Sequence, residues 1–141
     1  MMKGCTFAVA MLLTGFLHAT SECRIHTWHT INSLDGQWKI TLKMINQQGV
    51  FADRDCNPLT ETSLTAEQPL IYGFGFPDDA DFDLAYTVTA VKQEAGFQSK
   101  ACVFVVTAKG PAQPDITAIA YHGAECLWKV VRGVGEDFTV R

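Results

Sequence analysis

The segment Lys100–Ala108, KACVFVVTA, limits most strongly what this chain can fold into. Residues 101–106 are all apolar, and polar residues precede them while a Gly-Pro pair follows shortly after the segment. The run is too short for a typical helix, and its valines and threonine favour a pleated backbone. The segment therefore predicts a strand that is buried on both faces.

A second segment, Gln37–Ile45, alternates regularly between apolar and polar residues. This pattern predicts an antiparallel strand with one face in the core and one in solvent. Further strands are predicted at Arg24–Thr30, Leu70–Phe76, Leu84–Val91, Ile116–Tyr121 and Cys126–Val131, and shorter ones could form at Val50–Ala52 and Asp137–Val140. About seven short strands separated by turn residues predict an all-β fold, a single antiparallel β-sandwich or barrel.

Two expectations concern how these strands connect. Residues 53–69 lack a clear periodicity, and we expect a long polar connection there, pinned by Cys56, with room for one helical turn. The strand at Lys100–Ala108 should be central, with the two strands that follow it in the chain as its neighbours.

The N-terminus has the layout of a secretory signal. Lys3 precedes an uncharged apolar run, and Ala19-Thr20-Ser21 provides the small residues that a signal peptidase requires. We expect a signal peptide over residues 1–21 and a secreted β-domain over residues 22–141, with cleavage after Ala19 as the alternative. The apolar run is shorter than the roughly 20 residues that span a membrane, which disfavours an anchor. The mature protein should be secreted or periplasmic, with no transmembrane segment after cleavage.

The charge of the chain excludes one class of partner. The formal net charge is −4, and loss of Lys3 with the signal makes the mature domain one unit more negative. Nucleic-acid binding requires a basic surface, so no nucleic-acid partner is expected.

The cysteines fit an oxidising compartment. Cys5 leaves with the signal, and an even number in an exported chain predicts two disulfides. Four cysteines allow three connectivities. Cys102 and Cys126 lie on strand faces that can meet in the core, so we favour Cys102–Cys126 and, with it, Cys23–Cys56. Metal binding by these cysteines is disfavoured because they are scattered and form no C-x-x-C motif.

Catalysis and calcium binding have little support. The chain has no G-x-S-x-G motif and no nucleophile beside its histidines, so we predict that it is not an enzyme. Asp79, Asp81 and Asp83 have a spacing that can present oxygens to calcium, but the later glutamate of an EF-hand loop is missing. A solvated acidic turn is the simpler interpretation of these three residues.

Imidazole and phenol groups form another candidate set. Both ligate haem iron, and a porphyrin favours apolar and aromatic surroundings. The candidates for non-covalent hemin ligation are His26, His29, Tyr121 and His122. Ordinary aromatic core and surface residues are the competing interpretation of each. Covalent c-type haem is excluded because the chain has no C-x-x-C-H motif.

Several sequence features resemble a small family of exported bacterial proteins. They are the GFGFPDD turn, the SKACVFVVTA segment and the YHGAECLW and GVGEDF pieces of the C-terminal region, together with the chain length and the signal. Some members of this family are described as hemin-binding proteins. The resemblance implies a role in hemin binding or uptake at the cell envelope, but it assigns no ligand residues.

The resulting hypothesis is a secreted, non-enzymatic protein that promotes hemin binding or uptake at the cell envelope. The alternative is a secreted or periplasmic module that binds an envelope or host protein, or a glycan, without a role in haem. We expect any binding site near Tyr72–Asp83 or Tyr121–Glu125, where the strands end.

Overall fold

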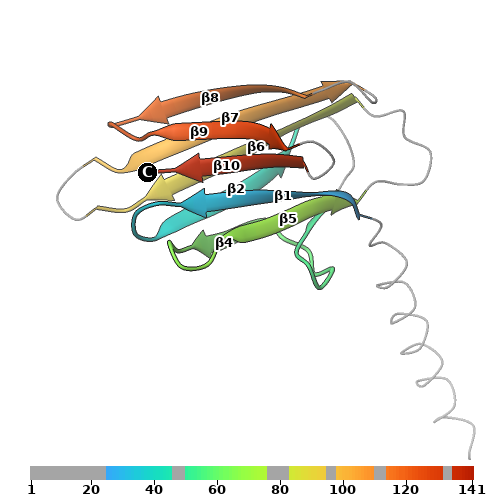
Figure 1. Cartoon of the computed structure of the whole chain (residues 1–141), viewed down its shortest axis with the longest axis horizontal. Helices are drawn as coiled ribbons and strands as arrows, with labels where there is room; N and C mark the ends of the chain where they lie inside the picture. The colour runs from blue at the N-terminus through green and yellow to red at the C-terminus, as the bar shows by residue number, and fades with distance from the viewer. Residues whose placement is uncertain (1–24, 46–49, 76–82, 95–97, 110–113, 132–134) are drawn as a thin grey trace, which may run out of the picture.

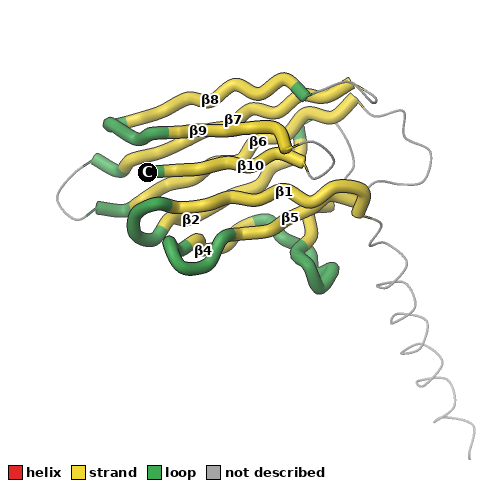
Figure 2. Tube along the Cα trace, in the orientation of Figure 1, coloured by secondary structure: helices red, strands yellow, loops and turns green. Residues whose placement is uncertain are grey.

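The chain folds as a β-sandwich of two five-stranded sheets (Figure 1). The computed structural model describes residues 25–45, 50–75, 83–94, 98–109, 114–131 and 135–141. In these residues strands are joined by loops and turns, and no helix occurs (Figure 2). It follows that this described part of the chain holds no helix long and apolar enough to cross a membrane.

Each sheet contains strands from distant parts of the chain. Sheet A consists, in spatial order, of β3 (Val50–Ala52), β5 (Leu70–Gly75), β1 (Ile25–Ser33), β10 (Gly135–Val140) and β9 (Cys126–Val131). Sheet B consists of β4 (Glu61–Leu64), β2 (Trp38–Met44), β6 (Asp83–Lys92), β7 (Lys100–Lys109) and β8 (Asp115–Tyr121). All pairings are antiparallel except that of β1 with β10, which is parallel. The all-β sandwich predicted from the sequence is therefore confirmed.

The number of strands was underestimated, since the described part of the chain has ten rather than about seven. Two of the additional strands, β3 and β10, are the short ones that the pattern allowed. The third, β4, lies in the stretch expected to be a polar connection. Only Leu64 of this strand is buried, so its sequence carries no alternation that would reveal it.

Alternation along the strands builds the core between the sheets. In β2, Trp38, Ile40 and Leu42 are buried while the lysines and the threonine between them are exposed. Phe104 of β7 and Phe138 of β10 meet across the interface with ring centroids 4.7 Å apart. Among the described residues, seventeen buried ones form this core cluster. One layer of apolar side chains thus holds both sheets together, as the sequence pattern predicts.

The position of β7 differs from the prediction in two respects. Its neighbours in sheet B are β6 and β8, whereas β9 belongs to the other sheet. Only one of its faces is fully buried, through Cys102, Phe104 and Val106; the opposite face is half-buried or exposed. The continuous apolar run arises because Ala101, Val103 and Val105 occupy the outer face of this strand.

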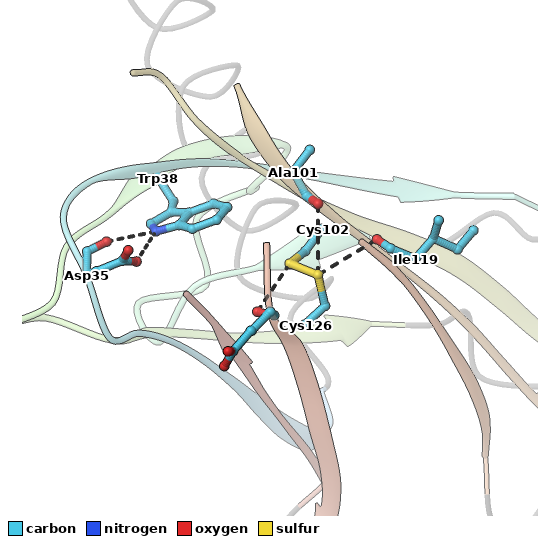
Figure 3. The surroundings of a disulfide bond; sticks show 7 residues. Asp35, Trp38, Ala101, Cys102, Ile119 and Cys126 are labelled. Carbon is cyan, nitrogen blue, oxygen red and sulfur yellow. Dashed lines mark hydrogen bonds between the residues drawn. A yellow bond between two sulfur atoms is a disulfide. The ribbon is translucent and has the colours of Figure 1, made fainter. Parts of the chain in front are cut away.

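The predicted disulfide between Cys102 and Cys126 is confirmed, and it links β7 of one sheet to β9 of the other (Figure 3). The two Cα atoms lie 5.6 Å apart, within the range that a disulfide requires. Cys56 is disulfide-bonded as well. Its predicted partner, Cys23, lies outside the described residues.

The crossing from β1 to β2 carries the chain from sheet A to sheet B. The Trp38 indole N–H donates to the Asp35 carbonyl oxygen at 2.9 Å, and Lys92 Nζ lies 2.9 Å from Asp35 Oδ2. Partial burial opposes ionisation of the Asp35 carboxyl, but hydrogen bonds from Lys92 and Trp38 outweigh it and lower the Asp35 pKa. Gly36 completes the turn at a φ of 60°, a conformation that glycine adopts without strain.

Candidate functional site

The connection between β8 and β9 is a tight turn that presents two of the predicted ligand residues. The Ala124 N–H donates to the Tyr121 carbonyl oxygen at 3.2 Å, which closes the turn. His122 and Gly123, its central residues, have positive φ values of 54° and 79°, as in the primed turns that connect antiparallel strands. Both Tyr121 and His122 are exposed. The turn therefore exposes a phenol and an imidazole on consecutive residues.

Exposed apolar side chains are concentrated in the same two strands. Among the described residues, seven large hydrophobic side chains are exposed, and four of these belong to β8 and β9. They are Ile119 (40% exposed), Tyr121 (46%), Leu127 (56%) and Trp128 (42%). Clusters of exposed apolar groups mark interaction sites more often than scattered ones do, so this edge of the sandwich is the leading candidate for a binding surface.

Ile119 and Tyr121 lie on the outer face of sheet B. Ile119 pairs with Val103 of β7, and Tyr121 pairs with Ala101. Val103 and Ala101 alternate with the buried residues of β7, so all four side chains point away from the core. The outer side chains farther into the sheet also carry no charge over several registers: Thr87, Thr89, Val91, Val105 and Thr117. An uncharged stretch of the outer face thus extends inward from the end of β8.

Trp128 is exposed for a different reason. It pairs with Phe138 of β10, which is fully buried, so its side chain lies on the core-facing side of sheet A. β9 is the last strand of its sheet, and no further strand covers this side chain. The sandwich is therefore open between β8 and β9, where Trp128 reaches solvent.

A second group of functional side chains is buried inside the sandwich. His29 of β1 contacts the carboxylate of Glu136 of β10 through its Nδ1, and both residues are more than nine-tenths buried. The Tyr72 and Tyr86 hydroxyls lie 3.1 Å apart, and the His29 and Tyr72 rings have centroids 5.2 Å apart. Burial raises the pKa of both Tyr72 and Tyr86, and nearby negative charge adds to this effect. The four side chains form a buried polar cluster that links the two sheets.

Gly135 makes the approach of β1 to β10 possible beside this cluster. Its φ is 122°, and a Cβ atom at this position would lie 2.3 Å from the Trp28 carbonyl oxygen and 2.9 Å from His29 Nδ1. Only glycine fits such a position. Gly135 therefore determines how closely His29 can pack against Glu136.

The predicted ligand residues occupy separate places. Tyr121 and His122 lie together at the turn, whereas His29 belongs to the buried polar cluster. His26 lies in β1, but its side chain is not among the described ones. The candidate hemin ligands therefore do not converge on one pocket within the described part of the chain.

The calcium candidates lie largely outside the described part of the molecule. Asp79 and Asp81 are not described, and Asp83 is described only as the first residue of β6. Within the described ranges, no group of three or more histidine, cysteine, aspartate or glutamate side chains is arranged to hold a metal ion.

A shallow hollow lies on sheet B away from the β8–β9 edge. Its volume is about 600 Å³, and its lining is mostly polar. The walls come from the β2–β4 pair and the end of β6: Gln37, Trp38, Lys39, Glu61, Thr62, Ser63, Val91 and Gln93. Lys39 and Glu61 form an ion pair of 2.8 Å across it, with both side chains more than half exposed. Trp38 is fully buried, so its indole ring cannot stack on a ligand in this hollow.

Sequence reasoning missed Glu136 as a member of a buried cluster, although a signal for it exists. In GEDFTV, Glu136 alternates with Phe138 and Val140, and all three are buried. A carboxylate in the register of two core residues predicts a buried partner. The sequence could not identify this partner as His29, because His29 lies in a strand more than a hundred residues before Glu136.

Searches of protein-family models, curated proteins and solved structures found no match to this chain.

Proposed function

We propose that this protein is a secreted, non-enzymatic hemin-binding protein that presents its ligand site at the β8–β9 turn. The observation that carries the proposal is the adjacency of the Tyr121 phenol and the His122 imidazole, both exposed, at the end of an apolar strand. Phenolate and imidazole are both established ligands of haem iron. The family resemblance of the sequence supports the same function.

The surface next to the turn suits one face of a porphyrin. Ile119 is exposed two residues before Tyr121, and its cross-strand neighbour Val103 is half-buried on the same face. Ile119 and Val103 on this uncharged surface would contact one face of the macrocycle, and a residue of the turn would supply the iron ligand.

The negative charge of the chain opposes the binding of hemin. Hemin carries two propionates, and the whole chain has a formal net charge of −4. Arg141 lies against Glu125 just beyond the turn, and Lys129 is 71% exposed on β9. Lys129 alternates with the core-facing Trp128, so it projects from the outer face of sheet A, whereas Ile119 and Tyr121 lie on the outer face of sheet B. Arg141 is therefore the cation to test, and binding should weaken when it is replaced by a neutral residue.

The direct test is titration of the purified, oxidised protein with hemin, monitored by the Soret absorption band. We expect a shifted band that saturates at one hemin per chain. Tyr121→Phe keeps the ring and removes the phenolate, whereas His122→Asn removes the imidazole and retains a residue that tolerates positive φ. At least one of these variants should lose the shifted band, and together they identify the iron ligand.

The matched control is His26→Asn, which removes a predicted ligand away from the turn. This variant should retain the Soret shift. A spectrum of protein with hemin identical to that of free hemin would refute the proposed function. A shift that survives both turn substitutions and disappears in His26→Asn would refute the proposed location.

A further inference from the structure

The free edges of the two sheets differ in a way that points to a partner. At one side of the sandwich the edge strands β3 and β4 contain three and four residues. At the other side β8 and β9 contain seven and six residues, and they lie together at the same side of the molecule (Figure 1). Long edges present unpaired backbone N–H and C=O groups, which proteins usually protect with charges, prolines or bulges.

The edge at β8 has little of this protection. Its sequence, DITAIAY, contains one charged residue, Asp115, at its first position, and neither proline nor lysine. Its register with β7 is continuous from Asp115 to Tyr121, so no bulge twists the edge away. Because Ile119 and Tyr121 are also exposed there, β8 is suited to pair with another strand.

We propose that this protein forms a symmetric homodimer in which β8 pairs with β8 and β9 with β9 of a second copy, which extends both sheets. A twofold axis perpendicular to a sheet pairs its edge strand antiparallel with itself. The second sheet is stacked on the first, so the same axis also brings together the two copies of β9. This inference does not depend on hemin binding.

The residues that face one another follow from the position of the axis. Through Ala118, the midpoint of β8, the axis pairs Asp115 with Tyr121 and Thr117 with Ile119 of the second copy. No like charges meet in this register. The Asp115 carboxylate faces an aromatic residue with a hydroxyl rather than its own copy.

The contact between β8 and β9 positions the same axis on β9. Cys126 Sγ lies 3.8 Å from the Ile119 carbonyl oxygen (Figure 3). Because the tight turn reverses the chain between β8 and β9, Leu127 follows at about the level of Ala118. An axis close to Leu127 pairs Leu127 with itself, Cys126 with Trp128, and Glu125 with Lys129 of the second copy. The last pair is oppositely charged. The dimer would therefore bring the exposed side chains of Leu127 and Trp128 into the interface and form two complementary charge pairs.

The size of the contact predicts its strength. The two edge strands contribute thirteen residues from each copy, fewer than the roughly 20–30 on each side of a standard interface. A dissociation constant in the micromolar range is therefore expected rather than a permanent dimer. Sedimentation equilibrium of the oxidised protein over a series of concentrations should show the transition from monomer to dimer.

Matched variants test the surface. Leu127→Lys places two ammonium groups face to face on the axis and should weaken dimerisation at least about tenfold. Leu34→Lys is the control, since Leu34 is 57% exposed against 56% for Leu127 and lies outside β8 and β9; it should not change dimerisation. A protein that stays monomeric at high micromolar concentration would overturn the proposal, as would a dimer that Leu127→Lys leaves unchanged.

A mixing experiment tests the register. Lys129→Glu alone brings Glu125 against a glutamate of the second copy, and Glu125→Lys alone brings two lysines together, so each variant should be monomeric. An equal mixture restores opposite charges at both pairs and should dimerise. If the mixture stays monomeric while the unaltered protein dimerises, the proposed register is wrong.

Discussion

Replacing Gly135 by alanine should destabilise this protein far more than its small size suggests. A Cβ atom at this position would lie 2.3 Å from the Trp28 carbonyl oxygen, which belongs to the backbone of β1 and cannot rotate away. The φ of 122° is also inaccessible to an L-residue without strain. β10 would have to separate from β1, with which it pairs in parallel from Thr30 to Ser33.

The magnitude follows from two terms. Backbone strain in such a conformation costs about 1–3 kcal/mol, and forcing an additional methyl group into a packed site costs about 1–3 kcal/mol. A loss of about 4 kcal/mol is a large fraction of the roughly 5–15 kcal/mol that stabilises a typical domain. Gly123→Ala is the control, because Gly123 also has positive φ, 79°, but a Cβ atom there meets nothing within 4 Å. It should cost only about 1–2 kcal/mol.

The assay is equilibrium unfolding in urea, followed by tryptophan fluorescence, with the disulfides intact in all proteins. The free energies of unfolding of the two alanine variants should differ by about 2–3 kcal/mol, with Gly135→Ala the less stable. If the two variants differ by less than about 0.5 kcal/mol, the strands adjust to the methyl group and the close-approach argument is wrong.

Three further predictions concern the disulfide and the buried polar cluster. Replacing Cys102 and Cys126 by alanine should lower the free energy of unfolding by about 3–4 kcal/mol, because the disulfide spans 24 residues of chain; thermal unfolding measures this. Glu136→Ala removes the carboxylate that contacts buried His29 and should cost about 3 kcal/mol, measured by urea unfolding. Tyr72 and Tyr86 have pKa values raised above 10.0, so above that pH the unfolded chain loses their protons and the native state does not. Stability should therefore fall as pH rises above 10.0, and tyrosinate absorbance from these two residues should appear only as the protein unfolds.

Each of these predictions has a control. Addition of a reductant to the protein without the Cys102–Cys126 bond should cause a smaller further loss than it does in the unaltered protein. Glu61→Ala removes an ion pair of exposed groups and should change stability by less than about 1 kcal/mol. If Glu61→Ala and Glu136→Ala lower the free energy of unfolding by the same amount, burial does not determine the contribution of these two ion pairs to stability. Tyrosinate absorbance from Tyr72 and Tyr86 in a protein that is still folded would contradict the alkaline prediction.

Local patterns predicted the strands with the clearest alternation. Trp38, Ile40 and Leu42 recur every second residue, and the structure buries all three on one face of β2. The same rule located β6 and grouped Cys102 with Phe104 and Val106 on the core-facing side of β7, although β7 itself was located by its unbroken apolar run. Period-two alternation is a property of the strand backbone itself, so it requires no knowledge of neighbours.

Neighbours that are distant in the chain could not be predicted in the same way. The sequence suggested that β9 would join β7 in one sheet, yet β9 pairs with β10, and only the disulfide connects it to β7. β4 was missed because four residues with one buried leucine carry no period. The sheet that β9 joins and the pairing of β4 with β2 both depend on which strand edges remain free when the sheets assemble.

The candidate sites show the same division. The turn residues of YHGA and the exposed ends of β8 and β9 are local features, and the sequence indicated this region as a place for binding. The contact of His29 with Glu136 joins the first described strand to the last, through a parallel pairing that Gly135 alone permits. Alternation determines which face a side chain occupies, because the strand backbone repeats every two residues. The partner of a side chain across the core depends on how strands distant in the chain pack against each other. The tertiary structure therefore decides that partner.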